Sequence, residues 1–327
     1  MIFITPLTSD IILVAMNLAA AVKKGDARVA ARLITLIEDE APEALDALEE
    51  LYPHTGRAYI IGVTGAPGVG KSTLTDCLID VFRKQNKSVG VIAIDPTSAL
   101  TGGALLGDRI RMQRHAADPG VFIRSLATRG WTGGLAKAAL GAVHVLDAMG
   151  KDFIIVETVG SGQVELDIVK AADTALLVLS PNTGDEIQTM KAGIIEWADV
   201  IAVNKADIPG VEKLKDDLTV MLEGKESGGW LPPVVLTEAV NGKGAGELAD
   251  ALLKHYEYLK STDTLTLRRR ERAKLELVEI AEENLKNLVH NPEGEKLLEK
   301  LVNDLQSGKT TPHRAARQVL SRLRKEA

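Results

Sequence analysis

Residues 65–72, Gly-Ala-Pro-Gly-Val-Gly-Lys-Ser, have the residue types and spacing of a phosphate-binding loop. Glycines let successive backbone N–H groups turn toward phosphate oxygens, and the N-terminus of the following helix adds partial positive charge. Lys71 can then reach the β- and γ-phosphates of a nucleotide, while the hydroxyl of Ser72 can bind Mg²⁺. The candidate phosphate-binding residues are Gly65, Ala66, Pro67, Gly68, Val69, Gly70, Lys71, Ser72 and Thr73.

The run Asn-Lys-Ala-Asp at 204–207 predicts that the base of this nucleotide is guanine. The carboxylate of Asp207 can accept hydrogen bonds from guanine N1–H and the 2-amino group together. Adenine lacks this pair of donors and would leave the carboxylate unpaired. Lys205 can lay its stem over the base, and Asn204 can tie its loop either to the purine or to the phosphate loop. GTP and GDP are therefore the expected ligands.

A third contact with the base is expected after the last strand. GTPases commonly have Ser-Ala at this place, with the backbone N–H of the alanine near guanine O6. Here the pair is Glu238-Ala239. A backbone contact from Ala239 survives this change, whereas any contact from a serine hydroxyl is lost.

Three acidic residues are candidate magnesium ligands together with Ser72. Glu157 ends an apolar run where many GTPases have an aspartate, and the nearby Gly160 N–H can sense the γ-phosphate. Asp95 also ends an apolar run, and Asp108 follows in the next loop. Magnesium prefers a few carboxylates alongside phosphates and waters. The alternatives are a turn residue for Asp95 and a helix N-cap for Asp108.

The position that often carries a catalytic glutamine is Ser161 in this chain. Many GTPases place glutamine there to orient the attacking water, and Gln163 is displaced by two positions. Lys191 and Gln188, which follow a later strand end, are the catalytic candidates besides Lys71. A lysine there would stabilise charge developing on the transferred phosphoryl group. The alternative for Lys191 is a solvated helix lysine.

The elements that must position these residues are short apolar strands alternating with helices. Runs that are apolar on both faces are typical of strands in a parallel sheet covered on both sides. The pattern predicts a doubly wound, mostly parallel α/β domain. The expected strands are 58–64, 88–95, 120–126, 152–158, 174–180, 199–205 and 233–239.

We expect an N-terminal helical extension at 1–55, a nucleotide-binding domain at 56–262 and a C-terminal helical arm at 263–327. The arm has no sheet to cover, so its apolar stripe is expected to form a homodimer. The basic run 268–272 is interpreted as a solvated helix face rather than a nucleic-acid patch. The apolar stripe comprises positions 275, 277, 278, 280, 285, 288 and 289.

Composition narrows the class of protein. The 327 residues carry a formal net charge of -6, which argues against nucleic-acid binding. The lone cysteine, Cys77, excludes an internal disulfide and is expected in a helix core. The most apolar segment, 11–22, is too short to span a membrane, and no targeting signal is visible. We expect a cytoplasmic protein, or a matrix protein if a transit peptide has been removed.

Several longer motifs together resemble the MeaB/ArgK family, the methylmalonyl-CoA-mutase-associated GTPases. They are GAPGVGKST, DPTSALTGGALLGDRIRM, ETVGSGQVE, NKAD and SGKTTPHRAA, and they extend over nearly the whole chain. The resemblance implies a homodimeric G-protein chaperone that accompanies an adenosylcobalamin-dependent mutase, gates cofactor loading and protects the enzyme. It implies that the partner stimulates GTP hydrolysis.

The resemblance also assigns roles to residues of this chain. Departures from the family pattern are Thr97, Ser161 and Glu238. The implied residues are Lys71 and Ser72 at the phosphates, Asp95, Asp108 and Glu157 around Mg²⁺, Asn204, Lys205 and Asp207 at the base, and Gln188 and Lys191 in a mobile third switch.

Three other functions fit parts of the pattern. Related GTPases deliver nickel, but the six histidines here form no pair at helical metal spacing and Cys77 stands alone. A kinase linked to amino-acid transport would need a second substrate site opposite the γ-phosphate, and no segment indicates one. A nucleotide-binding module without turnover is favoured only by the missing glutamine.

Overall fold

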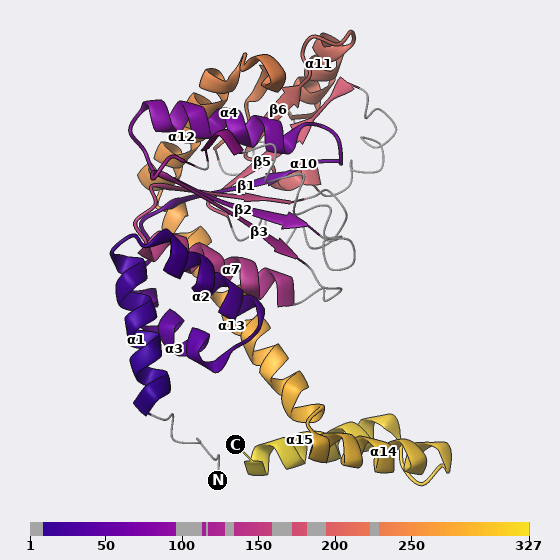
Figure 1. Cartoon of the computed structure of the whole chain (residues 1–327). Helices are drawn as coiled ribbons and strands as arrows, with labels where there is room; N and C mark the ends of the chain where they lie inside the picture. The colour runs from indigo at the N-terminus through magenta and orange to yellow at the C-terminus, as the bar shows by residue number, and fades with distance from the viewer. Residues whose placement is uncertain are drawn as a thin grey trace. The chain divides into compact units, whose positions relative to one another are not determined.

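The computed structural model describes residues 9–95, 113–115, 117–127, 134–158, 172–181, 194–222 and 229–326. Figure 1 shows the course of the chain. Residues 12–273 form one compact unit, and residues 274–327 with the first eleven form another. Among the described residues, no helix is both long and apolar enough to cross a membrane.

A seven-stranded parallel sheet forms the centre of the larger unit, which confirms the predicted fold class. The strand order is β3-β2-β4-β1-β5-β6-β7. All strands run the same way, so their carboxyl ends meet at one edge, where doubly wound sheets bind ligands. The strands are β1 (Tyr59–Thr64), β2 (Val89–Asp95), β3 (Val121–Ala127), β4 (Phe153–Glu157), β5 (Thr174–Leu179), β6 (Val200–Asn204) and β7 (Val234–Thr237).

Helices cover both faces of the sheet, which explains why most of the strands are nearly continuous apolar runs. Leu176 and Val178 of β5 lie in one core with α4 (Lys71–Lys84) and α12 (Ala245–Ser261). Leu177 and Leu179 lie in another core with α10 (Ile194–Trp197) and α11 (Val211–Leu222). A third core joins β2 and β4 to α7 (Gly134–Ala148). In Figure 1, α4 and α12 lie above the sheet and α7 lies below it.

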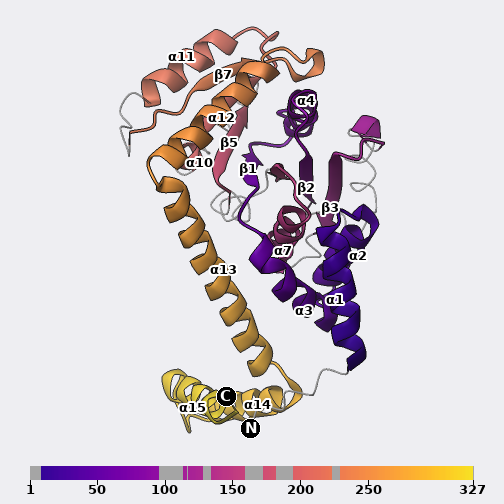
Figure 2. The ribbon, with the colours of Figure 1, turned by 90° about the vertical axis from the view of Figure 1, so that its left-hand side faces the viewer.

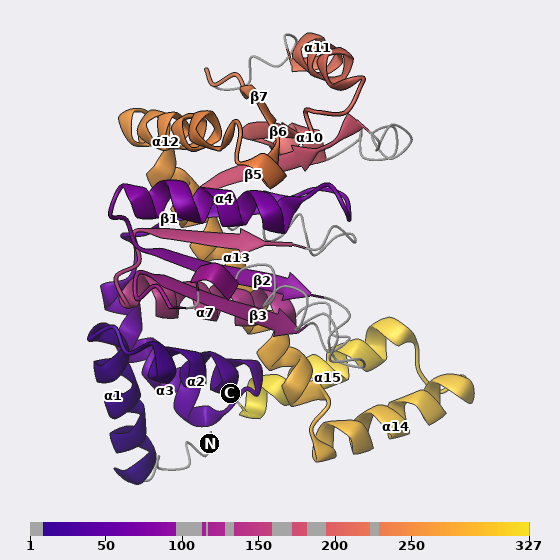
Figure 3. The ribbon, with the colours of Figure 1, turned by 45° about the horizontal axis from the view of Figure 1, so that its top comes forward.

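Three N-terminal helices form a further layer on the α7 side, visible in Figure 3. They are α1 (Ser9–Lys23), α2 (Ala27–Glu38) and α3 (Pro42–Leu51), and a 3₁₀ turn follows at Tyr52–His54. Leu33 and Ile34 are fully buried in the same core as Val143 of α7. Gly141 lets α2 approach closely, because an added Cβ would lie 3.0 Å from Ile37. The N-terminal helices thus share a core with the sheet.

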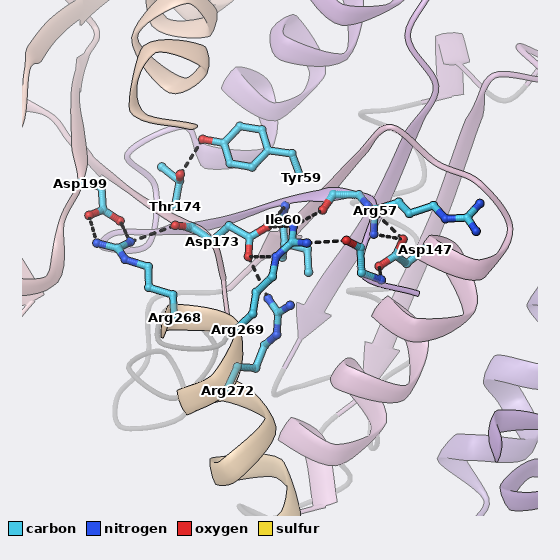
Figure 4. A network of polar contacts seen from close by, with 12 residues as sticks. Arg57, Tyr59, Ile60, Asp147, Asp173, Thr174, Asp199, Arg268, Arg269 and Arg272 are labelled. Atoms are coloured by element: carbon cyan, nitrogen blue, oxygen red, sulfur yellow. Dashed lines mark hydrogen bonds and ion pairs between the residues drawn. The ribbon is translucent and has the colours of Figure 1, made fainter. Parts of the chain in front are cut away.

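Arginines of α13 (Thr264–Val289) bind the amino-terminal edge of the sheet, as Figure 4 shows. Both terminal nitrogens of Arg268 donate to the carboxylate of Asp199, at 2.7 Å each. Arg269 and Arg272 donate to Asp173, at 2.9 and 3.2 Å. Asp173 is fully buried. The interpretation of 268–272 as a solvated face is therefore wrong for these three residues, because each pairs with a carboxylate that precedes a buried strand.

Further contacts tie this edge together. Arg269 also donates to the carbonyls of Gly56 and Ala58, just before β1. Tyr59 donates to Thr174 at 2.5 Å, and the Thr174 hydroxyl lies 2.7 Å from Nδ1 of His255. The first turns of α13 are consequently joined to the starts of β1, β5 and β6. We name the set Asp173, Asp199, Arg268, Arg269 and Arg272 the arginine clamp.

The smaller unit is a helical arm with little core of its own. It contains the end of α13, followed by α14 (Pro292–Gln306) and α15 (Pro312–Glu326), which pack against each other. Figure 2 shows these three helices from another side. The side chain of Asn291 caps α14 by accepting from Gly294 N at 2.7 Å. Large apolar side chains of the arm that remain exposed are Leu275, Leu277, Val278, Leu285, Leu288, Val302 and Leu320.

Candidate functional site

The predicted phosphate-binding loop connects β1 to α4 and has the backbone conformation that its glycines allow. Gly65, Gly68 and Gly70 have φ angles of 142°, 78° and 99°. Only glycine fits at two of these positions. A Cβ on Gly65 would lie 2.1 Å from the carbonyl oxygen of Val178, and one on Gly70 would lie 2.3 Å from Nδ2 of Asn204. The loop therefore packs tightly against β5 and the end of β6.

Lys71 is the first residue of α4 and is directed back over the loop. Its side chain is buried, and Nζ donates to the carbonyls of Gly65 at 2.6 Å and Ala66 at 3.0 Å. An ammonium in this position places a positive charge beside the loop and at the helix N-terminus. Both features favour bound phosphate. The structure thus brings together the loop and the cation that the sequence assigned to phosphate.

A hydroxyl and a carboxylate meet beside this lysine. The Ser72 hydroxyl donates to Oε1 of Glu157 at 2.5 Å, and Glu157 is only 6 % exposed at the end of β4. Two hard oxygen donors at the phosphate loop suit Mg²⁺. Asp95 ends β2, which pairs with β4 so that Ala93 lies opposite Glu157. The side chain of Asp95 lies outside the described residues, as do Asp108 and Gly160.

Asn204 joins the predicted base site to the phosphate loop. It is 3 % exposed at the end of β6. Its Nδ2 donates to the carbonyl of Val69 at 2.8 Å, while its Oδ1 accepts from Thr237 Oγ1 at 3.1 Å and Ala239 N at 3.0 Å. Of the two roles open from the sequence, the structure has the tie to the phosphate loop. One side chain thereby connects three segments that are far apart in sequence: the phosphate loop, the end of β6 and the residues at the end of β7 and just after it.

Lys205 is also held to the phosphate loop. Its φ of 60° is a left-handed conformation, rare for a residue with a side chain. Nζ donates to the carbonyl of Gly68 at 2.8 Å, so the aliphatic stem lies between the base motif and the loop. The next turn is closed by Ile208 N, which donates to the Lys205 carbonyl at 3.0 Å. Asp207 projects from this turn and is exposed. Its carboxylate is accessible to a ligand.

Sequence comparison identifies the family. The family described as "Methylmalonyl Co-A mutase-associated GTPase MeaB" matches residues 30–293. The chain belongs to the MeaB family. It is therefore a GTPase with the P-loop fold, as its sequence motifs predicted.

Relatives of this MeaB-family GTPase extend over almost its whole length. A Pyrococcus abyssi protein, whose name also gives its class as GTPase, is 49% identical over 311 residues, covering 94% of this chain and 96% of that protein. The "Methylmalonic aciduria type A homolog, mitochondrial" of Caenorhabditis elegans is 31% identical, covering 93% and 82%. The crystal structure of an LAO/AO transport system kinase has a TM-score of 0.71 at 23% identity and covers 95% and 98%. That likeness concerns the fold alone.

The base loop of this MeaB-family GTPase carries Glu238 where serine was expected. The Glu238 carboxylate binds Nζ of Lys243 at 2.9 Å and Nδ2 of Asn241 at 3.2 Å. These contacts lower its pKa, with the hydrogen bond from Lys243 as the largest cause. The backbone N–H of Glu238 donates to the Lys243 carbonyl at 3.0 Å. Glu238 therefore braces the loop rather than offering a hydroxyl to the base.

Two further points separate the structure from the sequence reasoning. The catalytic candidates Lys191 and Gln188 lie outside the described residues. Cys77 is buried as expected, and it also donates from Sγ to the carbonyl of Ala239 at 3.1 Å. The sequence carried no signal for this contact, because the two residues are 162 positions apart.

Proposed function

We propose that this protein is a GTP-hydrolysing chaperone, acting in the cytoplasm, of an adenosylcobalamin-dependent acyl-CoA mutase of the methylmalonyl-CoA mutase type. It would gate loading of the mutase cofactor and protect the mutase. The mutase partnership is supported by the printed name of the family and by its methylmalonic aciduria type A relatives. The observation that carries the nucleotide part is Asn204, which bonds to both the phosphate loop and the base loop.

Binding of GTP and GDP follows from the chemistry of the described side chains. The backbone N–H groups of 65–73 would hold the phosphates, with Lys71 supplying a positive charge. Asp207 would accept from the guanine donors, and Ala239 would lie at O6. The Ala239 N–H already donates to Asn204 Oδ1 at 3.0 Å. One hydrogen can be shared between two acceptors, so we propose that guanine O6 becomes the second acceptor.

Mg²⁺ would be held by Ser72 and Glu157, completed by Asp95, Asp108 and waters. When bound, the ion neutralises charge on the β- and γ-phosphates. The protein would have to keep other phosphoryl acceptors away from the γ-phosphate and orient the attacking water. Gly160 would sense the γ-phosphate, and Lys191 or Gln188 would approach it when a partner binds. Because Ser161 cannot present an amide to the water, hydrolysis by the isolated protein should be slow.

A homodimer formed through the arm is part of the proposal. The described side chains of residues 274–327 include only two buried apolar ones, Leu301 and Ala315. An apolar surface of this extent usually packs against another chain. Leu277→Glu should convert a dimer into a monomer, because Leu277 is 67% exposed and lies in the arm. Val220→Glu, at a site 69% exposed in the other unit, is the matched control and should stay dimeric in sedimentation.

Phosphate release tests the enzymatic part. The purified full chain is incubated with GTP or ATP, with Mg²⁺ or a chelator, and then with a purified methylmalonyl-CoA mutase. We expect GTP hydrolysis no faster than the roughly 10⁻⁴ to 10⁻³ per second of GTPases that keep the glutamine, no ATP hydrolysis, loss of activity with chelator and acceleration by the mutase. Equal use of ATP would contradict guanine selection. Transfer of labelled phosphate to another protein would indicate a kinase, and no effect of the mutase would contradict the partnership.

A further inference from the structure

The thiol of Cys77 closes a ring of contacts around the candidate base site. Asn204 Nδ2 donates to the carbonyl of Val69 in the phosphate loop, and Asn204 Oδ1 accepts from Ala239 N. The carbonyl of Ala239 in turn accepts from Cys77 Sγ at 3.1 Å. Cys77 lies on α4, the helix that continues directly from the phosphate loop. The ring therefore returns to the element where it began.

Ala239 is the residue that this ring fixes most fully. Its N–H is held by Asn204, and its carbonyl is held by Cys77 and by Gly242 N at 3.3 Å. It is 5% exposed and begins the 3₁₀ turn Ala239–Asn241. Holding both polar groups of one residue sets the direction of its N–H. That direction decides whether the N–H can reach a carbonyl at the edge of a bound base.

The surroundings of Cys77 keep its thiol able to donate a hydrogen bond. The thiol is 8% exposed, and burial is the largest cause of its raised pKa, with Asp76 contributing in the same direction. A raised pKa keeps the sulfur protonated at neutral pH, so S–H remains available to the carbonyl. A thiolate could not donate and would repel the carbonyl oxygen.

We propose that Cys77 is a positioning residue for guanine recognition, whose thiol holds the carbonyl of Ala239 and thereby aims the Ala239 N–H at guanine O6. This inference rests on the proposed binding of GTP. It extends the site to a residue that none of the motifs contains. The S–H donor is weak, so its removal should change affinity by a modest factor rather than abolish binding.

The test compares nucleotides whose bases each lack one ring substituent of guanine. Guanine and hypoxanthine both carry O6, whereas 2-aminopurine lacks it and keeps the 2-amino group. Cys77→Val fills a similar volume without a donor. We expect it to weaken GTP and ITP each by about threefold to tenfold, with less than a twofold change for 2-aminopurine riboside triphosphate. Cys77→Ser, which keeps a donor, should recover part of the loss.

Ile79→Val is the matched control. Ile79 is fully buried on α4 in the same core, so this variant loses packing without losing a hydrogen bond. It should leave the ratio of GTP to 2-aminopurine affinity unchanged. If Cys77→Val weakens all three nucleotides equally, or none, the positioning role is overturned. If the unmutated protein fails to bind GTP, the proposed function itself fails.

Discussion

Asp173→Asn should strongly destabilise the protein, because this buried carboxylate accepts from three surrounding groups. Ile60 N donates to it at 3.1 Å, Arg269 at 2.9 and 3.2 Å, and Arg272 at 3.2 Å. Asparagine offers one acceptor oxygen and turns an amide donor toward a guanidinium. Breaking a buried ion pair on one side costs about 3 to 5 kcal/mol. The two arginines remain 21% and 13% exposed, so water relieves part of the loss. We expect about 3 kcal/mol.

Urea unfolding of the full chain measures this loss. Trp230 donates from its indole N–H to the Asp199 carbonyl at 2.8 Å, so its fluorescence reports on the same edge of the sheet. Glu257→Gln is the control, because Glu257 is 70% exposed and pairs with Lys260 on the surface. It should cost less than about 0.5 kcal/mol. A loss below about 1 kcal/mol for Asp173→Asn would refute the argument that the arginine clamp fixes α13.

Three other predictions address the base, the pH response and the switch. Asp207→Asn should weaken GTP by about 2 kcal/mol and improve XTP, whose 2-carbonyl accepts from the new amide; unchanged affinities in a titration would remove Asp207 from the site. Burial lowers the pKa of His255 to about 4, with Arg268 assisting and Asp199 opposing. His255 is thus neutral in the fold. Its contribution to the free energy of unfolding, about 3 kcal/mol, should be fully present above pH 6.5 and disappear as the pH falls toward 4. His255→Gln should abolish this pH dependence in unfolding curves. Lys191→Ala should keep basal phosphate release and lose partner stimulation; full stimulation would exclude the switch role.

The fold could be predicted because its signals are local. Most strands are nearly continuous apolar runs, and these runs are apolar on both faces because helices cover both sides. The phosphate loop could also be predicted from its own residues. Its glycine spacing is required by the structure, because a Cβ on Gly65 or Gly70 would collide with a neighbouring atom. The guanine motif followed from the position of 204–207 at a strand end. These features depend on residue type and on nearby positions along the chain.

The contacts that escaped prediction join distant positions. Arg269 and Asp173 are 96 residues apart, and Asn204 and Val69 are 135 apart. A run of arginines on a helix is usually solvated, and only the strand order shows that buried carboxylates lie opposite it. The Ala239 contact of Cys77 has the same origin. The sequence establishes which residue types are present, but the pairing of strands decides which of them meet.

The arginine clamp also determines where the chain can be divided. A protein shortened to residue 262 would lose all three arginines and leave the buried carboxylates of Asp173 and Asp199, just before β5 and β6, without these partners. Such a fragment should aggregate or unfold, and its behaviour would say nothing about dimerisation. A fragment ending at Ala273 retains the clamp and coincides with the end of the larger compact unit. The first turns of α13 are thus a structural part of the nucleotide-binding domain. The arm could be shortened or replaced only beyond them.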